Sequence, residues 1–129
     1  MAGRRAARRT ALFLLYQWDL LPERPLASLH EGDIDPFARD LAEAVAARAP
    51  ALDARITEAA EGWRAERLGT LERNILRIAV LELGTGDVPA EVAIDEAVEL
   101  AKRYASDDAA KLVNGILGRI HREAALDGR

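Results

Sequence analysis

The sequence predicts an all-α fold, and three observations support this. Apolar residues recur every three or four positions along most of the 129-residue chain, which is the spacing of one helix face. No segment alternates apolar and polar residues for long enough to indicate a strand. The length is typical of one domain, and no repeat or Gly/Ser-rich linker divides it. We therefore expect one compact bundle, residues 1–129, of about six to seven helices.

The first half of the chain is expected to contain three helices. The first runs from Arg4 to Leu20 and is followed by the loop sequence LLPERP. Asp35 and Pro36 then form an N-cap and first-turn pair typical of a helix start. Because proline disrupts a helix interior, we expect the sequence RAP at 48–50 to end this second helix, with a third beginning at Ala51. The apolar face of the third helix comprises Leu52, Ile56, Ala59 and Trp63.

The second half is expected to contain three more helices. Thr70 is expected to cap a fourth helix, Leu71–Leu83, which is apolar almost all round and is therefore a candidate for the centre of the bundle. The sequence GTGDVP ends it, and a fifth helix is expected from Ala90 to Tyr104. Ser106 or Asp107 is expected to cap a sixth.

Two glycines interrupt the apolar stripe of this sixth helix. Gly115 and Gly118 lie in its interior, where each is less favourable than alanine by about 1 kcal/mol. We expect another helix to approach closely at these positions.

Positive charge is concentrated at the start of an otherwise acidic chain. The formal net charge is -4, yet residues 1–10 contain four arginines and no acid. A pI near 5.2 argues against a protein that coats nucleic acid non-specifically, but it is compatible with one local basic site.

The arginines at the start of the first helix are Arg4, Arg5, Arg8 and Arg9. The helix dipole disfavours positive side chains at this end by a few tenths of a kcal/mol each. A bound anion would remove the conflict, because free backbone N–H groups and guanidinium groups both favour phosphate. The alternative is a solvated helix start that binds nothing.

At about 100° per residue, the first helix has two apolar faces. The core-facing side holds Ala7, Ala11, Leu14, Leu15 and Trp18. The opposite side holds Arg5, Arg9, Leu12, Phe13, Tyr16 and Leu20. A helix at the edge of a domain buries both faces only if something covers the second one. Another helix, a second copy of the chain or a different partner would each do so.

Catalytic chemistry is not expected. His30 and His121 have no metal-ligand neighbour at helical spacing, no Gly-rich phosphate loop follows a strand, and cysteine is absent. We expect no metal and no cofactor. The apolar run behind the arginines is too short for a membrane span and lacks a cleavage site, so a cytoplasmic protein without membrane contact is expected.

Four segments together resemble the NusB family of bacterial transcription antitermination factors. They are RRAARRTALFLLYQWDL, ERNILRIAVLEL, VPAEVAIDEAVELAKRY and KLVNGILGRI, and they occur in the family's order and spacing. The resemblance covers residues 4 to 120 apart from the loop near 22–34. It implies two packed three-helix subdomains and a non-enzymatic role. That role is binding the boxA RNA of nascent ribosomal RNA transcripts with NusE, a small-subunit ribosomal protein, within an RNA polymerase antitermination complex.

The resemblance also implies roles for individual residues. The four arginines match the RNA-contacting segment, Asp108 and Leu112 match RNA-contacting positions, and Tyr16 and Glu72 match positions that face NusE. Lys111 is a further candidate RNA contact, because it lies about one turn from Asn114, a residue that is unfavourable inside a helix unless its amide is used. Leu12 and Phe13 join Tyr16 as candidate partner contacts, because they share its face.

The sequence departs from the family pattern at two positions. Leu112 stands where many members have phenylalanine, so base stacking of roughly 1–3 kcal/mol is lost there. Asp95 stands where asparagine is common and adds a negative charge. Both departures are expected to affect RNA affinity.

Two other functions compete with antitermination. One is a self-associating helical adaptor, in which a second copy covers the Tyr16 face. The other is the helical module of a ribosomal RNA cytosine methyltransferase, whose catalytic domain would need cysteine nucleophiles and a Gly-rich cofactor loop that this sequence does not contain.

Overall fold

The computed structural model describes residues 3–30, 32–60 and 68–126, and every regular element within these ranges is a helix. The α-helices are α1 (Arg4–Leu20), α2 (Pro36–Ala59), α3 (Thr70–Thr85), α4 (Ala90–Tyr104) and α5 (Asp107–Leu126). A short 3-10 helix, Leu26–Ser28, lies between α1 and α2. The predicted all-α class is confirmed, with five α-helices in the described residues instead of the six to seven expected.

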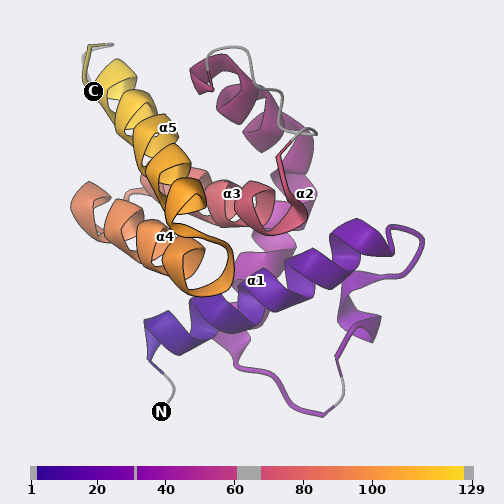
Figure 1. Cartoon of the computed structure of the whole chain (residues 1–129). Helices are drawn as coiled ribbons and strands as arrows, with labels where there is room; N and C mark the ends of the chain where they lie inside the picture. Colours follow the sequence, from indigo (N-terminus) through magenta and orange to yellow (C-terminus); the bar gives the residue numbers. More distant parts are fainter. Residues whose placement is uncertain (1–2, 31, 61–67, 127–129) are drawn as a thin grey trace.

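The lower helix count arises because α2 continues through Pro50. The prediction that the sequence RAP ends this helix is therefore wrong. Proline removes one backbone hydrogen bond and disfavours a helix interior by about 3 kcal/mol. Burial offsets this, because Val45 and Ala49 before the proline and Leu52 and Ile56 after it all lie in the core. The helix changes direction along its length (Figure 1), and Pro50 supplies the physical reason. Trp63, expected on the same face, lies outside the described residues.

α3 is the central helix, as predicted, and it packs against all four other α-helices (Figure 1). Every residue from Asn74 to Glu82 is buried. The helix begins with Gly69 in the N-cap position, one residue before the predicted cap Thr70. It ends at Gly86, whose φ of 71° is the left-handed conformation that glycine adopts at a helix end.

The remaining helices are arranged in two groups around α3. α1 packs against α2 and α3, whereas α4 and α5 pack against each other and against α3. Among the described residues the N-terminal group thus contains two α-helices rather than three, because the long α2 replaces two of the predicted ones. Ser106 caps α5, since its hydroxyl oxygen accepts a hydrogen bond from the Ala109 N–H at 2.9 Å. This outcome selects Ser106 over Asp107 as the cap.

A polar cluster, formed by Asp19, Asp53, Arg73, Asn74 and Arg77, fastens α1 and α2 to α3. Asp19 Oδ2 accepts hydrogen bonds from Arg73 Nε at 2.9 Å and from Asn74 Nδ2 at 3.1 Å. Arg77 donates to both carboxylate oxygens of Asp53 at 2.7 Å. Burial by itself lowers the pKa of Arg77, but the hydrogen bonds and charge of Asp53, with Asp19, outweigh it and the pKa is raised.

The two glycines of α5 do not mark a close helix contact, so that prediction is wrong. A Cβ added at Gly115 would meet no atom within 4 Å, and one at Gly118 would meet only Arg122 of the same helix. No described helix is long and apolar enough to cross a membrane.

Candidate nucleic-acid interface

α1 begins without a capping side chain and without an acid in its own first turn. Its N-cap residue is Gly3. The free N–H groups of the first turn therefore add to the positive field of the arginines. A helix start of this kind is suited to an anion such as phosphate.

Arg8 is not part of this exposed positive surface. Its side chain is only 4% exposed and forms a two-point ion pair with Glu82 of α3, with Nε–Oε1 and Nη2–Oε2 distances of 2.9 Å. The expectation that all four arginines are presented to RNA therefore has to be corrected. A buried arginine is stable only with a partner, and Glu82 fills that role here.

Arg5, in contrast, is 73% exposed although it also has a carboxylate partner. Glu96 of α4 accepts hydrogen bonds from Arg5 Nε at 3.1 and 3.2 Å and from Nη2 at 2.9 Å. These hydrogen bonds raise the pKa of Arg5, and the negative charge of Glu96 adds to the effect. The contact links the start of α1 to the middle of α4.

The other two arginines are accessible in different ways. Arg4 is exposed, and its guanidinium lies over the Phe37 ring, 4.9 Å from the ring centre. Both residues line a hollow of about 410 Å³ between α1, α2 and the end of α3. Arg9 is partly exposed and has no hydrogen bond or ion pair within the described part of the chain. Three of the four arginines are therefore available to a ligand.

α1 and α4 meet along a seam, defined here by the Arg5–Glu96 pair and the Phe13–Tyr104 pair. The two rings meet edge to face at a centroid distance of 5.0 Å. Eight residues separate the two contacts on each helix, about 12 Å at 1.5 Å per residue, so the contacts follow the same chain order on α1 and on α4.

The seam leads from the arginines to the start of α5. α5 begins three residues after Tyr104. Its first two turns carry Asp108 and Lys111, both exposed, and Leu112, which is partly buried against the core. The seam thus connects the two groups of residues that the sequence assigned to RNA. Asp95, the other departure from the family pattern, is exposed in the first half of α4.

The candidate partner residues lie further along α1 than the arginines, and Phe13 belongs both to them and to the seam. Phe13 is 38% exposed and Tyr16 is partly buried, and at the end of the helix Leu20 is 54% exposed. Leu12 is fully buried, so its placement on the outer face was wrong. The buried arc of α1 is wider than one stripe because the helix packs against both α2 and α3.

Glu72 lies at the same end of the molecule as Tyr16. It precedes Arg73, whose partner Asp19 lies one turn after Tyr16. The Glu72 carboxylate folds back over Gly69, where an added Cβ would lie only 2.0 Å from Oε2. The polar cluster thus places the start of α3, which carries Glu72, beside the end of α1, which carries Tyr16.

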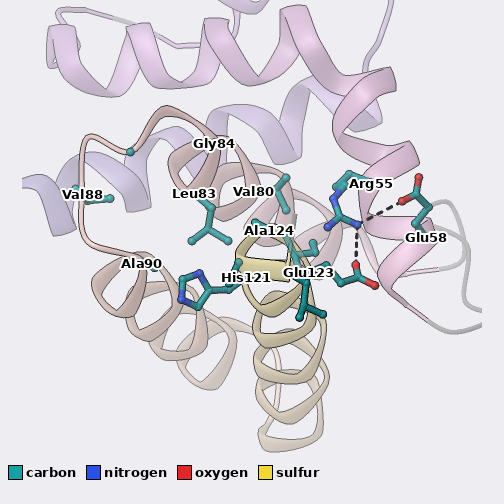
Figure 2. A pocket seen from close by; sticks show the side chains of 14 residues that line it. Arg55, Glu58, Val80, Leu83, Gly84, Val88, Ala90, His121, Glu123 and Ala124 are labelled. Atoms are coloured by element: carbon teal, nitrogen blue, oxygen red, sulfur yellow. Dashed lines mark hydrogen bonds and ion pairs between the residues drawn. The ribbon is translucent and has the colours of Figure 1, made fainter. Parts of the chain in front are cut away.

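A second hollow, of about 770 Å³, lies elsewhere, between α2 and the C-terminal ends of α3 and α5 (Figure 2). Arg55 at its edge pairs with Glu58 at 3.4 Å and with Glu123 at 3.1 Å (Figure 2). The hydrogen bond from Arg55, followed by that from Arg119, outweighs desolvation and lowers the pKa of Glu123. This hollow contains no unpaired arginine that would attract an anion. No cluster of three or more metal-binding side chains occurs in the ranges described.

Sequence reasoning missed the acids that hold the arginines. Glu82 carried a usable signal, because a charged residue in an otherwise apolar helix requires a buried partner. The same signal marked Arg77 in the same helix. No such signal marked Glu96. It is one of several acids in the α4 segment, and the sequence does not distinguish it from the others.

Comparisons with known proteins agree with this arrangement. The NusB family model matches residues 5–122. The chain is 40% identical to the transcription antitermination protein NusB of Solibacter usitatus, over 95% of this chain and 91% of that protein. It is 42% identical to the transcription antitermination protein NusB of Salinispora tropica, over 93% of this chain and 96% of that protein.

Two solved structures are also similar. T. maritima NusB has a TM-score of 0.84 at 34% identity, over 95% of this chain and 92% of that one. The second is a chain from a complex of antitermination factors NusB and NusE with double-stranded RNA. It has a TM-score of 0.80 at 30% identity, and the match covers 93% of this chain and 96% of that chain. The family match spans most of the chain, and the relatives exceed 30% identity over nearly their whole length. On this evidence the chain belongs to the NusB family.

Proposed function

We propose that the protein is a transcription antitermination factor. It binds the boxA element of nascent ribosomal RNA transcripts together with NusE, and the complex joins RNA polymerase. The observation that carries this proposal is the accessible group of Arg4, Arg5 and Arg9 at the uncapped start of α1. The similar chain solved with NusE and double-stranded RNA supports it.

The proposal divides the RNA contacts between two helix starts. Arg4, Arg5 and Arg9 contact phosphates, and Asp108, Lys111 and Leu112 contact the RNA further along the seam. Arg8 acts indirectly, because its buried pair with Glu82 fixes the helix that carries the other three.

NusE is proposed to bind α1 beyond the arginines, from the middle of the helix towards its C-terminal end. Phe13, Tyr16 and Glu72 provide an apolar surface with one acid beside it, which suits a basic ribosomal protein. Leu12 supports this surface from the core. The exposed Leu20 beside it would suit a second copy of the chain equally well, and sedimentation of the free protein distinguishes a monomer from a dimer.

The proposal is tested by titrating fluorescently labelled boxA RNA with the protein, with and without NusE, and by repeating the titration with a scrambled RNA. Sequence-selective binding that NusE strengthens is expected. Equal affinity for both RNAs would contradict boxA recognition. Absence of any effect of NusE would contradict the assignment of the Tyr16 surface.

A further inference from the structure

Arg5 and Glu96 differ strongly in exposure, and this difference limits what Arg5 can do. The Arg5 side chain is 73% exposed, whereas that of Glu96 is only 15% exposed. If Arg5 swung away to bind another anion, a largely buried carboxylate would lose its partner, which is unfavourable. We therefore expect Arg5 to keep its contact with Glu96 when a ligand binds.

The contact with Glu96 uses only one edge of the Arg5 guanidinium. Nε and Nη2 donate to the two carboxylate oxygens, and Nη1 makes no hydrogen bond within the described residues. A guanidinium has five N–H donors in a rigid plane. Its other edge, formed by Nη1 and the second N–H of Nη2, is therefore free to bind a second anion with two hydrogen bonds.

We propose that Glu96 is a positioning residue: it holds Arg5 so that the free edge of the guanidinium contacts an RNA phosphate. This inference rests on the RNA-binding function proposed above. It implies that position 5 requires arginine specifically, because one side chain must bridge a carboxylate and a phosphate at the same time. Positive charge alone is not sufficient there.

A lysine at position 5 would bind Glu96 but not bridge it to a phosphate. The ammonium group would reach the carboxylate, since Arg5 Nε, which is closer to the backbone than a lysine Nζ, already lies 3.1 Å from it. The charge would then be neutralised by Glu96, and the nearby Glu99 would add further negative charge. A compact ammonium has no second planar edge to offer.

Arg9 provides a comparison on the same helix. It lies one turn after Arg5 and has no ion pair within the described residues. A lysine at position 9 keeps a free positive charge, so Arg9→Lys is expected to weaken RNA binding less than Arg5→Lys does. An equal or larger loss for Arg9→Lys would contradict the specific need for arginine at position 5.

The test is boxA affinity, measured by fluorescence anisotropy, for Arg5→Lys in the wild-type and Glu96→Gln backgrounds. In the wild-type background we expect at least fivefold weaker binding and a log–log salt slope flatter by about 0.7. In the Glu96→Gln background, which frees the lysine charge, Arg5→Lys should change affinity less than twofold.

Two results would overturn the positioning role while leaving the RNA-binding function in place. One is that Arg5→Lys binds within twofold of the wild type. The other is that the loss is equal in both backgrounds, which would mean that Glu96 has no part in it. If the wild-type protein itself fails to bind boxA RNA, the proposed function is wrong. Unchanged melting temperatures of all variants would show that the substitutions leave the fold intact.

Discussion

Arg8 of α1 and Glu82 of α3 form a buried two-point ion pair, with both Nε–Oε1 and Nη2–Oε2 at 2.9 Å. The pair joins the first helix of the chain to the central one. Because Arg8 is buried in this pair, it is not available to a ligand at the basic start of α1, and it holds α1 against α3 instead. The other three arginines then lie on a helix whose position is fixed.

Removing one member of this pair should destabilise the protein severely. Glu82→Ala leaves the Arg8 charge buried without a partner, and a loss of about 3–5 kcal/mol in the free energy of unfolding is expected. Urea denaturation measures it, with Glu82→Gln as a milder variant that keeps one acceptor. Arg9→Ala is the control and should cost less than about 0.5 kcal/mol. A loss below about 1 kcal/mol for Glu82→Ala would contradict the anchoring role.

Asp19→Ala should weaken both the fold and NusE binding. Asp19 Oδ2 accepts hydrogen bonds from Arg73, Asn74 and Arg77, and hydrogen bonds to charged groups contribute about 1.5–3 kcal/mol. We expect a loss of about 2–3 kcal/mol in urea denaturation. Calorimetric titration with NusE should show weaker association, because α1 and the start of α3 lose their fixed relation. The exposed Asp87→Ala is the control; equal effects of the two variants would contradict this account.

Gly115→Ala should stabilise the protein. The position is helical and exposed, and an added methyl group meets no atom within 4 Å. Alanine is more favourable than glycine in a helix interior by about 1 kcal/mol. We expect a gain of about 0.5–1 kcal/mol and a higher melting temperature, measured by thermal denaturation. A loss of stability would show that the glycine is needed for packing after all.

Glu123 should contribute a pH-dependent part of the stability. Arg55 and Arg119 lower its pKa in the folded protein, so its contribution is fully present above the unfolded pKa of about 4.3. This contribution is lost as the pH falls through the lower folded value. The urea midpoint of Glu123→Gln should therefore lie below that of the wild type at pH 7, and the difference should shrink towards pH 3. A difference that stays the same from pH 7 to pH 3 would contradict this contribution of Glu123.

Local sequence rules predicted most helix ends correctly. The bounds of α1 and α4 and the capping role of Asp35 at α2, where Phe37 N–H donates to Oδ1 at 2.8 Å, agree with the structure. These features depend on neighbouring residues, so a single sequence contains the information. The apolar character of α3 likewise predicted its central position, because only a surrounded helix can bury so many apolar residues.

The errors arose where distant segments decide the outcome. A proline by itself predicts a break in a helix. α2 nevertheless continues through Pro50, because residues on both sides of it are buried in the core, and neighbouring residues in the sequence do not reveal this burial. The helical wheel placed Leu12 on the outer face, and Arg8 was expected to contact RNA with the other arginines. Both are buried instead, because α2 and α3 pack against α1 and Glu82 pairs with Arg8. The role of Arg8 depends on an acid 74 residues away, a relation that helical periodicity does not contain.

The central claim is that the accessible arginines of α1 contact RNA phosphates. The most direct test is the salt dependence of boxA binding for the wild type and for the double variant Arg5→Ala with Arg9→Ala. Each phosphate contact contributes roughly 0.7 to the log–log slope for a single strand. We predict that the double variant flattens the slope by about 1.4 and binds more weakly at low salt. A slope identical to that of the wild type would contradict the claim and place the RNA site elsewhere on the protein.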